Sequence, residues 1–174
     1  MQVEHTPIAG VTLVKPRVWR DARGYFVETW QKTRYADIGI DLPFVQDNQS
    51  LSGKDTLRGM HFQKHHPQGK LVFCPVGRVF DVACDIRRDS PTYGQCFGVE
   101  LNEDNLWQLW IAPGLAHGFC VLSDKAIFQY KCTDFYHPGD EGGFAWNDPF
   151  FKIDWPIKDP ILSEKDKNAP FWER

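Results

Sequence analysis

The sequence lacks several features that would place it in common classes of protein. None of its apolar runs approaches the roughly 18 residues that a membrane-spanning helix requires. Its first residues lack the basic stretch followed by an apolar stretch that marks a secretion signal. Its 20 basic residues do not outnumber its 23 acidic ones, and the formal net charge is -3, whereas nucleic-acid-binding domains normally carry a basic patch. We therefore expect no membrane span, no secretion signal and no nucleic-acid partner.

The cysteines offer no sign of a disulfide framework or a zinc motif. There are five of them, an odd number, and no two are separated by only two residues. Most lie in apolar runs, where a thiol packs as a small hydrophobic group. We expect all five to be reduced thiols in a cytoplasmic protein: Cys74, Cys84, Cys96, Cys120 and Cys132.

Aromatic and turn-forming residues, in contrast, are abundant. The chain has 13 Phe, 7 Trp and 5 Tyr, with 14 Gly and 12 Pro, a composition that favours many strands joined by tight turns. Strand-sized runs recur without intervening helical patterns, which predicts an antiparallel sandwich or barrel. The expected strands are 8–16, 44–50, 71–76, 78–86, 95–101, 106–111, 117–122 and 126–133, with short helices at 31–39 and after Ser163. With 174 residues and no linker or repeat, we expect a single domain over 1–174.

The segment from Leu57 to Leu71 holds the first group of candidate functional residues. Arg58 and His61 are three residues apart, and Lys70 follows nine residues after His61. Because side chains alternate along a strand, His61 and Gln63 should face one side while their apolar neighbours pack on the other. A histidine so placed can act in a pocket, but it can equally be a hydrogen-bonded structural residue.

Three later segments carry further candidates. His117 follows the turn at 113–116, Tyr130 shares a strand face with Phe128 and Cys132, and Lys165 precedes Asp166 near the C-terminus. Taken singly, each has an ordinary structural explanation as a core aromatic, a turn residue or a solvated surface charge. The residues alone therefore leave both a functional and a purely structural interpretation open.

Six segments, taken together and in order, resemble the dTDP-4-dehydrorhamnose 3,5-epimerase family. They are RGMHFQ at 58–63, QGKLV at 68–72, VFDVA at 79–83, DSPTYG at 89–94, PGLAHGF at 113–119 and LSEKD at 162–166. The resemblance extends from about residue 7 to about residue 170. It implies an all-β, cupin-type antiparallel β jelly roll with short peripheral helices, and a homodimer with exchanged N-terminal strands. It also implies a nucleoside-diphosphate 4-keto-6-deoxy sugar as substrate and no metal or cofactor.

The chemistry of such a reaction explains which residue types it needs. Inverting a carbon next to a ketone requires a base, a stabiliser for the enolate and a proton donor on the opposite face. The resemblance assigns these roles to His61 as base, Asp166 as the carboxylate that orients its ring, Lys70 at the enolate oxygen and Tyr130 as donor. His117 is implied to contact the sugar.

The resemblance also implies residues for the nucleotide end of the substrate. Arginine and lysine suit phosphate oxygens, and Tyr136 matches an aromatic that stacks on the base. The positions implied to contact this part of the ligand are Arg23, Glu28, Gln46, Asn48, Arg58, Tyr136, Glu141 and Lys165. Because Arg23 and Glu28 lie early in the chain, we expect them to serve the neighbouring subunit's site.

The sequence departs from the family pattern at a few places. Phe73 stands where many relatives have a basic residue, Phe135 replaces a usual tyrosine, and His65-His66 lies in a loop slightly shorter than expected. None of these changes removes a proposed acid or base. They leave open which nucleotide and sugar are bound and whether one or both of C3 and C5 are inverted, so a single-carbon epimerase acting on a substrate such as a GDP-4-keto-heptose is an alternative.

Two further alternatives belong to other functional classes. A metal-dependent cupin has donors available on paper, namely His61, His65, His66, His117 and Glu100, but it usually needs two histidines separated by one residue, and position 63 is a glutamine. A catalytically silent sugar-nucleotide-binding cupin would have no need of a base and an acid together.

Overall fold

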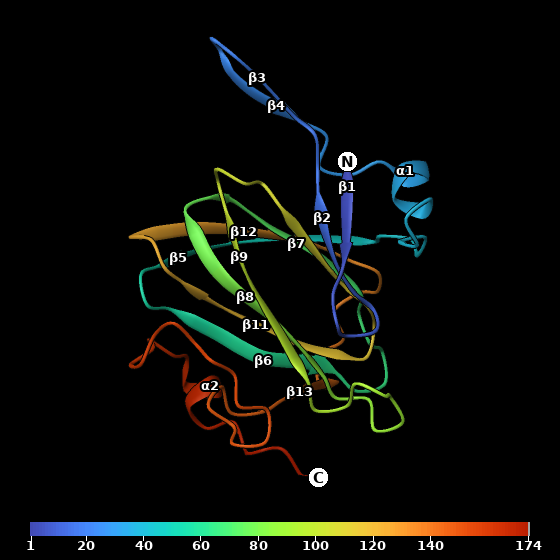
Figure 1. Ribbon diagram of the computed structural model, residues 1–174. Coiled ribbons are helices and arrows are strands. Elements are labelled where there is room, and N and C mark those ends of the chain that lie inside the picture. Colours follow the sequence, from blue (N-terminus) through green and yellow to red (C-terminus); the bar gives the residue numbers. More distant parts are fainter. Residues whose placement is uncertain (174) are drawn as a thin grey trace.

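The computed structural model describes residues 1–173 and is composed mainly of strands (Figure 1). The strands are β1 (Gln2–His5), β2 (Val11–Lys15), β3 (Val18–Asp21), β4 (Gly24–Val27), β5 (Gln46–Gly53), β6 (Leu57–Gln63), β7 (Lys70–Val76), β8 (Arg78–Asp85), β9 (Cys96–Asn102), β10 (Gln108–Ile111), β11 (Leu115–Val121), β12 (Lys125–Cys132) and β13 (Glu141–Gly143). Two short helices are α1 (Lys32–Ala36) and α2 (Glu164–Lys167).

Two antiparallel sheets form a β jelly roll, so the expected fold class is confirmed. One sheet has the strand order β1-β2-β10-β7-β12-β5, and the other has the order β13-β6-β11-β8-β9. Alternate side chains of both sheets meet in a shared apolar core, which includes Val72 and Phe128 from the first sheet and Val79 and Phe119 from the second. The strands of the two sheets thereby form opposite walls around the interior.

The C-terminal part of the chain covers the outer face of the second sheet. Phe144, Phe151 and Trp155 pack with Met60 and Cys120 in a separate buried cluster. Figure 1 shows this segment in orange and red below β6. The amide of Leu57 donates to the carbonyl of Ile161 over 3.0 Å, and this contact directs the chain so that α2 lies beside β6.

Both expected helices are present, although each is short. Gln31 caps α1 by accepting from the amide of Arg34 over 2.7 Å, and Gly39 follows the helix with a φ of +84° that favours glycine. Ser163 caps α2 by accepting from the amide of Asp166 over 3.1 Å. Within residues 1–173 no helix is long and apolar enough to cross a membrane.

The strands that the sequence-based expectation did not include are β1, β3, β4 and β13, and two of them show why. β1 is an exposed, mostly polar strand that pairs only with β2, so it lacks the apolar alternation of a half-buried strand. β13 reads Glu-Gly-Gly and pairs with β6 through Gly142 and Gly143, residues that intrinsically disfavour strands. In both cases, pairing with a neighbouring strand determines the structure.

The expectation of five reduced thiols is wrong for Cys84 and Cys96. These residues face each other on β8 and β9 and form a disulfide, with Cα atoms 4.1 Å apart. In the adjacent pair, the amide of Asp85 donates to the carbonyl of Gln95 over 2.9 Å. The cysteines therefore occupy a non-hydrogen-bonded position, where opposed side chains lie closest.

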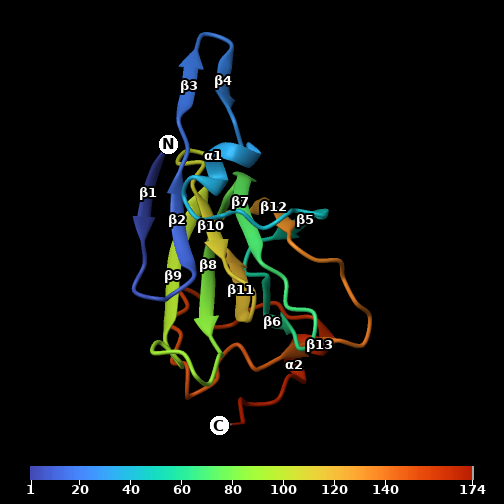
Figure 2. The same cartoon turned by 90° about the vertical axis from the view of Figure 1, so that its right-hand side faces the viewer.

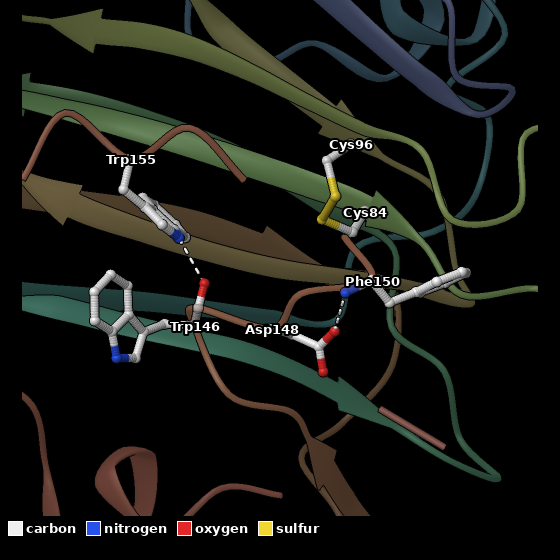
Figure 3. Close-up of a disulfide and its surroundings, with 6 residues drawn as sticks. All are labelled: Cys84, Cys96, Trp146, Asp148, Phe150 and Trp155. Atoms are coloured by element: carbon white, nitrogen blue, oxygen red, sulfur yellow. Dashed lines mark hydrogen bonds between the residues drawn. A yellow bond between two sulfur atoms is a disulfide. The ribbon is translucent and has the colours of Figure 1, made fainter. Parts of the chain in front are cut away.

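Figure 3 shows the disulfide beside Phe150, with Trp155 donating to the carbonyl of Trp146 over 2.8 Å along the same covering segment. Cys74, Cys120 and Cys132 are free and buried, as expected. The cytoplasmic location stays a prediction. Its argument rested on reduced thiols, so the disulfide between Cys84 and Cys96 does not support it.

The β3–β4 hairpin stands apart from both sheets. It extends beyond the ends of the other strands in Figures 1 and 2. The side chains of Trp19 and Phe26 pack on each other at a centroid distance of 5.8 Å, yet these residues remain 42% and 68% exposed. An isolated two-stranded hairpin is marginally stable in water, so these aromatic residues favour contact with a further surface.

Candidate active site

The interior between the two sheets contains two adjoining cavities of about 310 Å³ and 220 Å³. Both are lined by His61, Lys70 and Tyr130, which lie where the cavities meet. We call the larger one the outer chamber and the smaller one the inner chamber. His61 comes from β6 in one sheet, whereas Lys70 and Tyr130 come from β7 and β12 in the other. The three side chains therefore converge from opposite walls.

His61 is paired with a carboxylate that is 105 residues away in the sequence. Its Nε2 lies 2.6 Å from Oδ1 of Asp166, which is only 5% exposed. Burial alone would raise the pKa of Asp166, but the hydrogen bond and charge of His61 hold it below its usual value. An ionised Asp166 accepts from Nε2 and leaves Nδ1 of the ring to take up a proton.

A second histidine-carboxylate pair lies deeper in the interior. His117 is directly opposite His61 in the β6–β11 pairing, and its Nε2 lies 2.8 Å from Oδ2 of the fully buried Asp81 on β8. Burial lowers the pKa of His117, and Asp81 offsets this only in part. His117 is therefore suited to act as a neutral hydrogen-bonding group in the inner chamber.

Lys70 and Tyr130 lie close together on the wall opposite His61. The ammonium group of Lys70 is 5.9 Å from the centroid of the Tyr130 ring. Burial lowers the pKa of Lys70, although nearby thiol and carboxyl groups act in the opposite direction. Burial raises the pKa of Tyr130, which keeps its hydroxyl protonated at neutral pH.

This arrangement suits proton transfer on two faces of one bound ring. A ring held at the meeting point of the chambers would have His61 on one side and Tyr130 on the other, with Lys70 available to a developing negative charge. Groups fixed before the reaction stabilise such charge without reorganisation.

Comparison with known proteins identifies the group of enzymes to which this site belongs. The family model described as dTDP-4-dehydrorhamnose 3,5-epimerase matches residues 5–174. The chain belongs to this family. The dTDP-4-dehydrorhamnose 3,5-epimerase of Shigella flexneri is 50% identical over 97% of this chain and 94% of its own length. The sequence-based assignment to a family of epimerases is thereby confirmed.

Solved structures of epimerases from this family have the same fold. The Legionella pneumophila enzyme, in complex with dTDP-4-keto-L-rhamnose, has a TM-score of 0.95 and 48% identity over 98% of this chain and 92% of that one. The Bacillus anthracis enzyme, with TDP and PPi bound, has a TM-score of 0.95 and 40% identity over 98% of this chain and 99% of that one.

Several residues that the family resemblance assigned to the nucleotide do line the outer chamber. Gln46, Asn48, Tyr136 and Glu141 surround it, and Lys165 reaches its edge through a 2.6 Å ion pair with Glu141. The amide of Tyr136 donates to Gln46 Oε1 over 2.9 Å, which positions the loop that carries the aromatic ring. Their roles in an epimerase of this family remain predictions.

Three other predicted residues are placed differently. Arg58 lines the inner chamber and donates to Ser52 Oγ over 3.0 Å. Arg23 is near the tip of the β3–β4 hairpin, where it pairs with Asp21, and Glu28 pairs with Arg34. The structure does not bring Arg23 or Glu28 into the chain's own cleft.

Sequence reasoning missed some residues that line the cleft or support it from behind. Asp81 lies inside the apolar run Val79–Ala83, which resembles a family motif. A carboxylate in such a run indicates a buried polar partner, and in the structure that partner is His117. Gln63 lines the outer chamber together with His61, as strand alternation predicted, and Gln68 also lines it, although a glutamine in a loop carries no sequence signal of this kind.

The donors considered for a metal-dependent cupin do not gather at one point. His61 and His117 are each hydrogen-bonded to a carboxylate. Glu100 on β9 binds Arg78 and Asn102. The geometry of the cleft therefore favours acid-base chemistry by side chains over the cupin metal arrangement.

Proposed function

We propose that this chain inverts C3 and C5 of dTDP-4-dehydro-6-deoxyglucose and so forms dTDP-4-dehydrorhamnose. The observation that carries the proposal is the placement of the His61–Asp166 pair and Tyr130 on opposite walls of one cleft. Relatives that share half of the sequence bear the name of this activity. A related epimerase is known in complex with the corresponding 4-keto sugar.

Each inversion proceeds through an enolate. Nδ1 of His61 takes the proton from the carbon next to the C4 ketone, and the C–H electron pair moves into an enolate whose oxygen is stabilised by Lys70. The hydroxyl of Tyr130 then gives a proton to the opposite face of that carbon. His61 releases its proton to solvent, and Tyr130 regains one from solvent, so no net proton is consumed.

The two chambers divide the substrate between them in this proposal. The inner chamber, with His117 and Arg58, takes the sugar and the adjoining phosphate. The outer chamber, with Gln46, Asn48 and the ring of Tyr136, takes the nucleoside. Lys165 and Glu141 lie at its edge.

We also propose that two copies pair through the β3–β4 hairpins, so that Arg23 and Glu28 of each copy complete the partner's cleft. The exposed aromatic residues of the hairpin and its separation from both sheets support this arrangement. Arg23 is nearly fully exposed apart from its bond to Asp21, and an exposed arginine at a tip is available to a phosphate of a neighbouring site.

Mixing two inactive variants tests the shared site. Arg23→Ala and His61→Ala should each lose activity as homodimers. After mixing and subunit exchange, heterodimers hold one cleft with both residues intact, so about a quarter of all clefts regain activity if pairing is random. Turnover of the mixture, measured after mild dissociation and reassociation, gives the result. No recovery despite verified exchange would show that Arg23 acts in its own chain or not at all.

Hydrogen exchange from solvent tests the reaction itself. A panel of dTDP- and GDP-linked 4-keto-6-deoxy sugars is incubated with the protein in deuterated water, and label at C3 and C5 is located by NMR and mass spectrometry. We expect label at both carbons of dTDP-4-dehydro-6-deoxyglucose and accumulation of the rhamno product. Label at one carbon, or only with a GDP sugar, would favour the single-carbon alternative. Binding without label would favour a silent sugar-nucleotide-binding protein.

A further inference from the structure

We propose that His66, Asp134 and His137 form a binding site for a divalent transition-metal ion of the Zn²⁺ type at the rim of the cleft. His66 belongs to the β6–β7 loop, and the other two belong to the loop between β12 and β13. None of the three has a role in the proposed proton transfers. The site is therefore separate from the chemistry assigned to His61 and Tyr130.

The three side chains are grouped closely enough to share one ion. Nδ1 of His66 lies 3.9 Å from Oδ2 of Asp134, and Nε2 of His137 lies 3.8 Å from Oδ1. The ligand atoms of all three are within 4.8 Å of one another. Tetrahedral zinc with bonds of about 2.0–2.2 Å holds its ligand atoms about 3.3–3.5 Å apart. The two distances to Asp134 thus need to shorten by about 0.5 Å, and no distance in the group by more than about 1.5 Å.

One ring nitrogen in this group lacks a hydrogen-bond partner. Nε2 of His137 is buried and makes no hydrogen bond in the described part of the chain, and its 3.8 Å approach to Asp134 is too long to be one. Burying a polar atom without a partner is unfavourable. An ion between His137 and Asp134 would satisfy this nitrogen directly.

The backbones that carry the three side chains are already tied together. The side-chain amide of Gln63 accepts from the amide of His137 over 2.9 Å and donates to the carbonyl of His66 over 2.7 Å. The side chain of Gln68 donates to the carbonyl of Asp134 over 2.8 Å. Such fixed supports reduce the conformational entropy lost when ligands assemble around an ion.

The imidazole rings of His66 and His137 must rotate before both can bind the same ion. Their rings are stacked, with centroids 4.0 Å apart and planes at 18°, so their in-plane lone pairs do not meet at one point. The side chains of His66 and His137 are 51% and 38% exposed, which leaves room for rotation about the Cβ–Cγ bonds. Two imidazoles and one carboxylate suit Zn²⁺ better than Mg²⁺ or Ca²⁺, which prefer oxygen ligands.

Binding at this place would join the two loops at the cleft mouth. Tyr136 lies between Asp134 and His137 in the sequence, and its ring lines the outer chamber. A bound ion would fix the loop on both sides of Tyr136. Metal binding at this site would thus make the β12–β13 loop beside the outer chamber more rigid.

Metal titration of tag-free, chelator-treated and dialysed protein tests the proposal. Co²⁺ binding is followed by its visible absorption bands, and Zn²⁺ binding by calorimetry. We expect one ion per chain and at least about a tenfold loss of affinity in His66→Gln and in His137→Gln, since changes even to groups that only support metal ligands cost 10–100-fold. His65→Gln is the matched control, because His65 is adjacent and exposed but outside the group.

The outcome is independent of the proposed function because the readout is metal binding. His61→Ala should bind the ion as the unchanged protein does, which separates this site from the catalytic cleft. Equal affinity in the His66 and His137 variants, loss of binding in His65→Gln or His61→Ala, or absence of binding at millimolar Zn²⁺ would each overturn the proposal. Circular dichroism of every variant establishes that the fold is retained.

Discussion

Replacing His61 with alanine should lower turnover by about 10²–10⁴, the range by which a positioned general base accelerates proton transfer. Nδ1 of His61 is the only nitrogen of this ring left for a substrate proton, because Nε2 is held by Asp166 at 2.6 Å. The variant should also lose label at C3 and C5 in deuterated water, since no proton is then abstracted. Steady-state rates and NMR of the sugar measure both effects.

Tyr130→Phe is the informative comparison for His61→Ala. It keeps the base and removes the donor from the opposite wall, so we expect net inversion to fall while some deuterium exchange persists. Exchange at the normal rate in His61→Ala would contradict the assignment of the base. Both variants should retain the strand-rich circular dichroism spectrum, because His61 and Tyr130 line cavities and are only partly buried.

Replacing Lys70 with methionine should lower kcat by about 10²–10³, the loss typical of removing one preorganised group that stabilises a developing oxyanion. Methionine keeps much of the length of the side chain and removes the ammonium group proposed to stabilise the enolate. Lys125→Met is the matched control, because Lys125 is exposed at the start of β12 and away from the cleft. Its turnover should stay unchanged.

The same substitution carries a prediction for stability with a defined sign. Burial lowers the pKa of Lys70 in the folded state relative to the unfolded chain. The protonated side chain is therefore less stable in the folded protein than in the unfolded chain, and it lowers the free energy of unfolding at neutral pH. The Tm of Lys70→Met should therefore equal or exceed that of the unchanged protein at pH 7, even as activity falls. A large drop in Tm would indicate that the lost turnover reflects unfolding.

The positions of the core strands along the chain followed closely from the sequence, because each buried strand carries an apolar run between turn residues. The runs at 71–76 and 126–133 became β7 and β12, with each end shifted by one residue or none. The His61–Asp166 contact was accessible only through the family resemblance. No spacing rule joins residues 105 positions apart, and the contact depends on how Ile161 attaches to the edge of β6.

Other features depend on strand register, which the sequence does not state. Cys84 and Cys96 are twelve residues apart, and only the pairing of β8 with β9 places them directly opposite each other. Asp81 and His117 likewise meet because β8 and β11 are neighbours in the sheet. The partners proposed for Arg23 and Glu28 belong to a second copy of the chain, so the sequence pattern of one chain carries no signal for their surroundings.

The attachment of the C-terminal segment to β6 separates two properties that evolution can change independently. The carboxylate that binds His61 is supplied by α2, whereas most of the residues that line the two chambers belong to the strands and the β12–β13 loop. Substitutions in those strands and that loop can change the shape of the chambers while the hydrogen bond between His61 and Asp166 stays the same. Conversely, a change at Ile161, whose carbonyl accepts from the amide of Leu57, can alter the placement of Asp166 beside His61 while the residues that line the outer chamber stay the same.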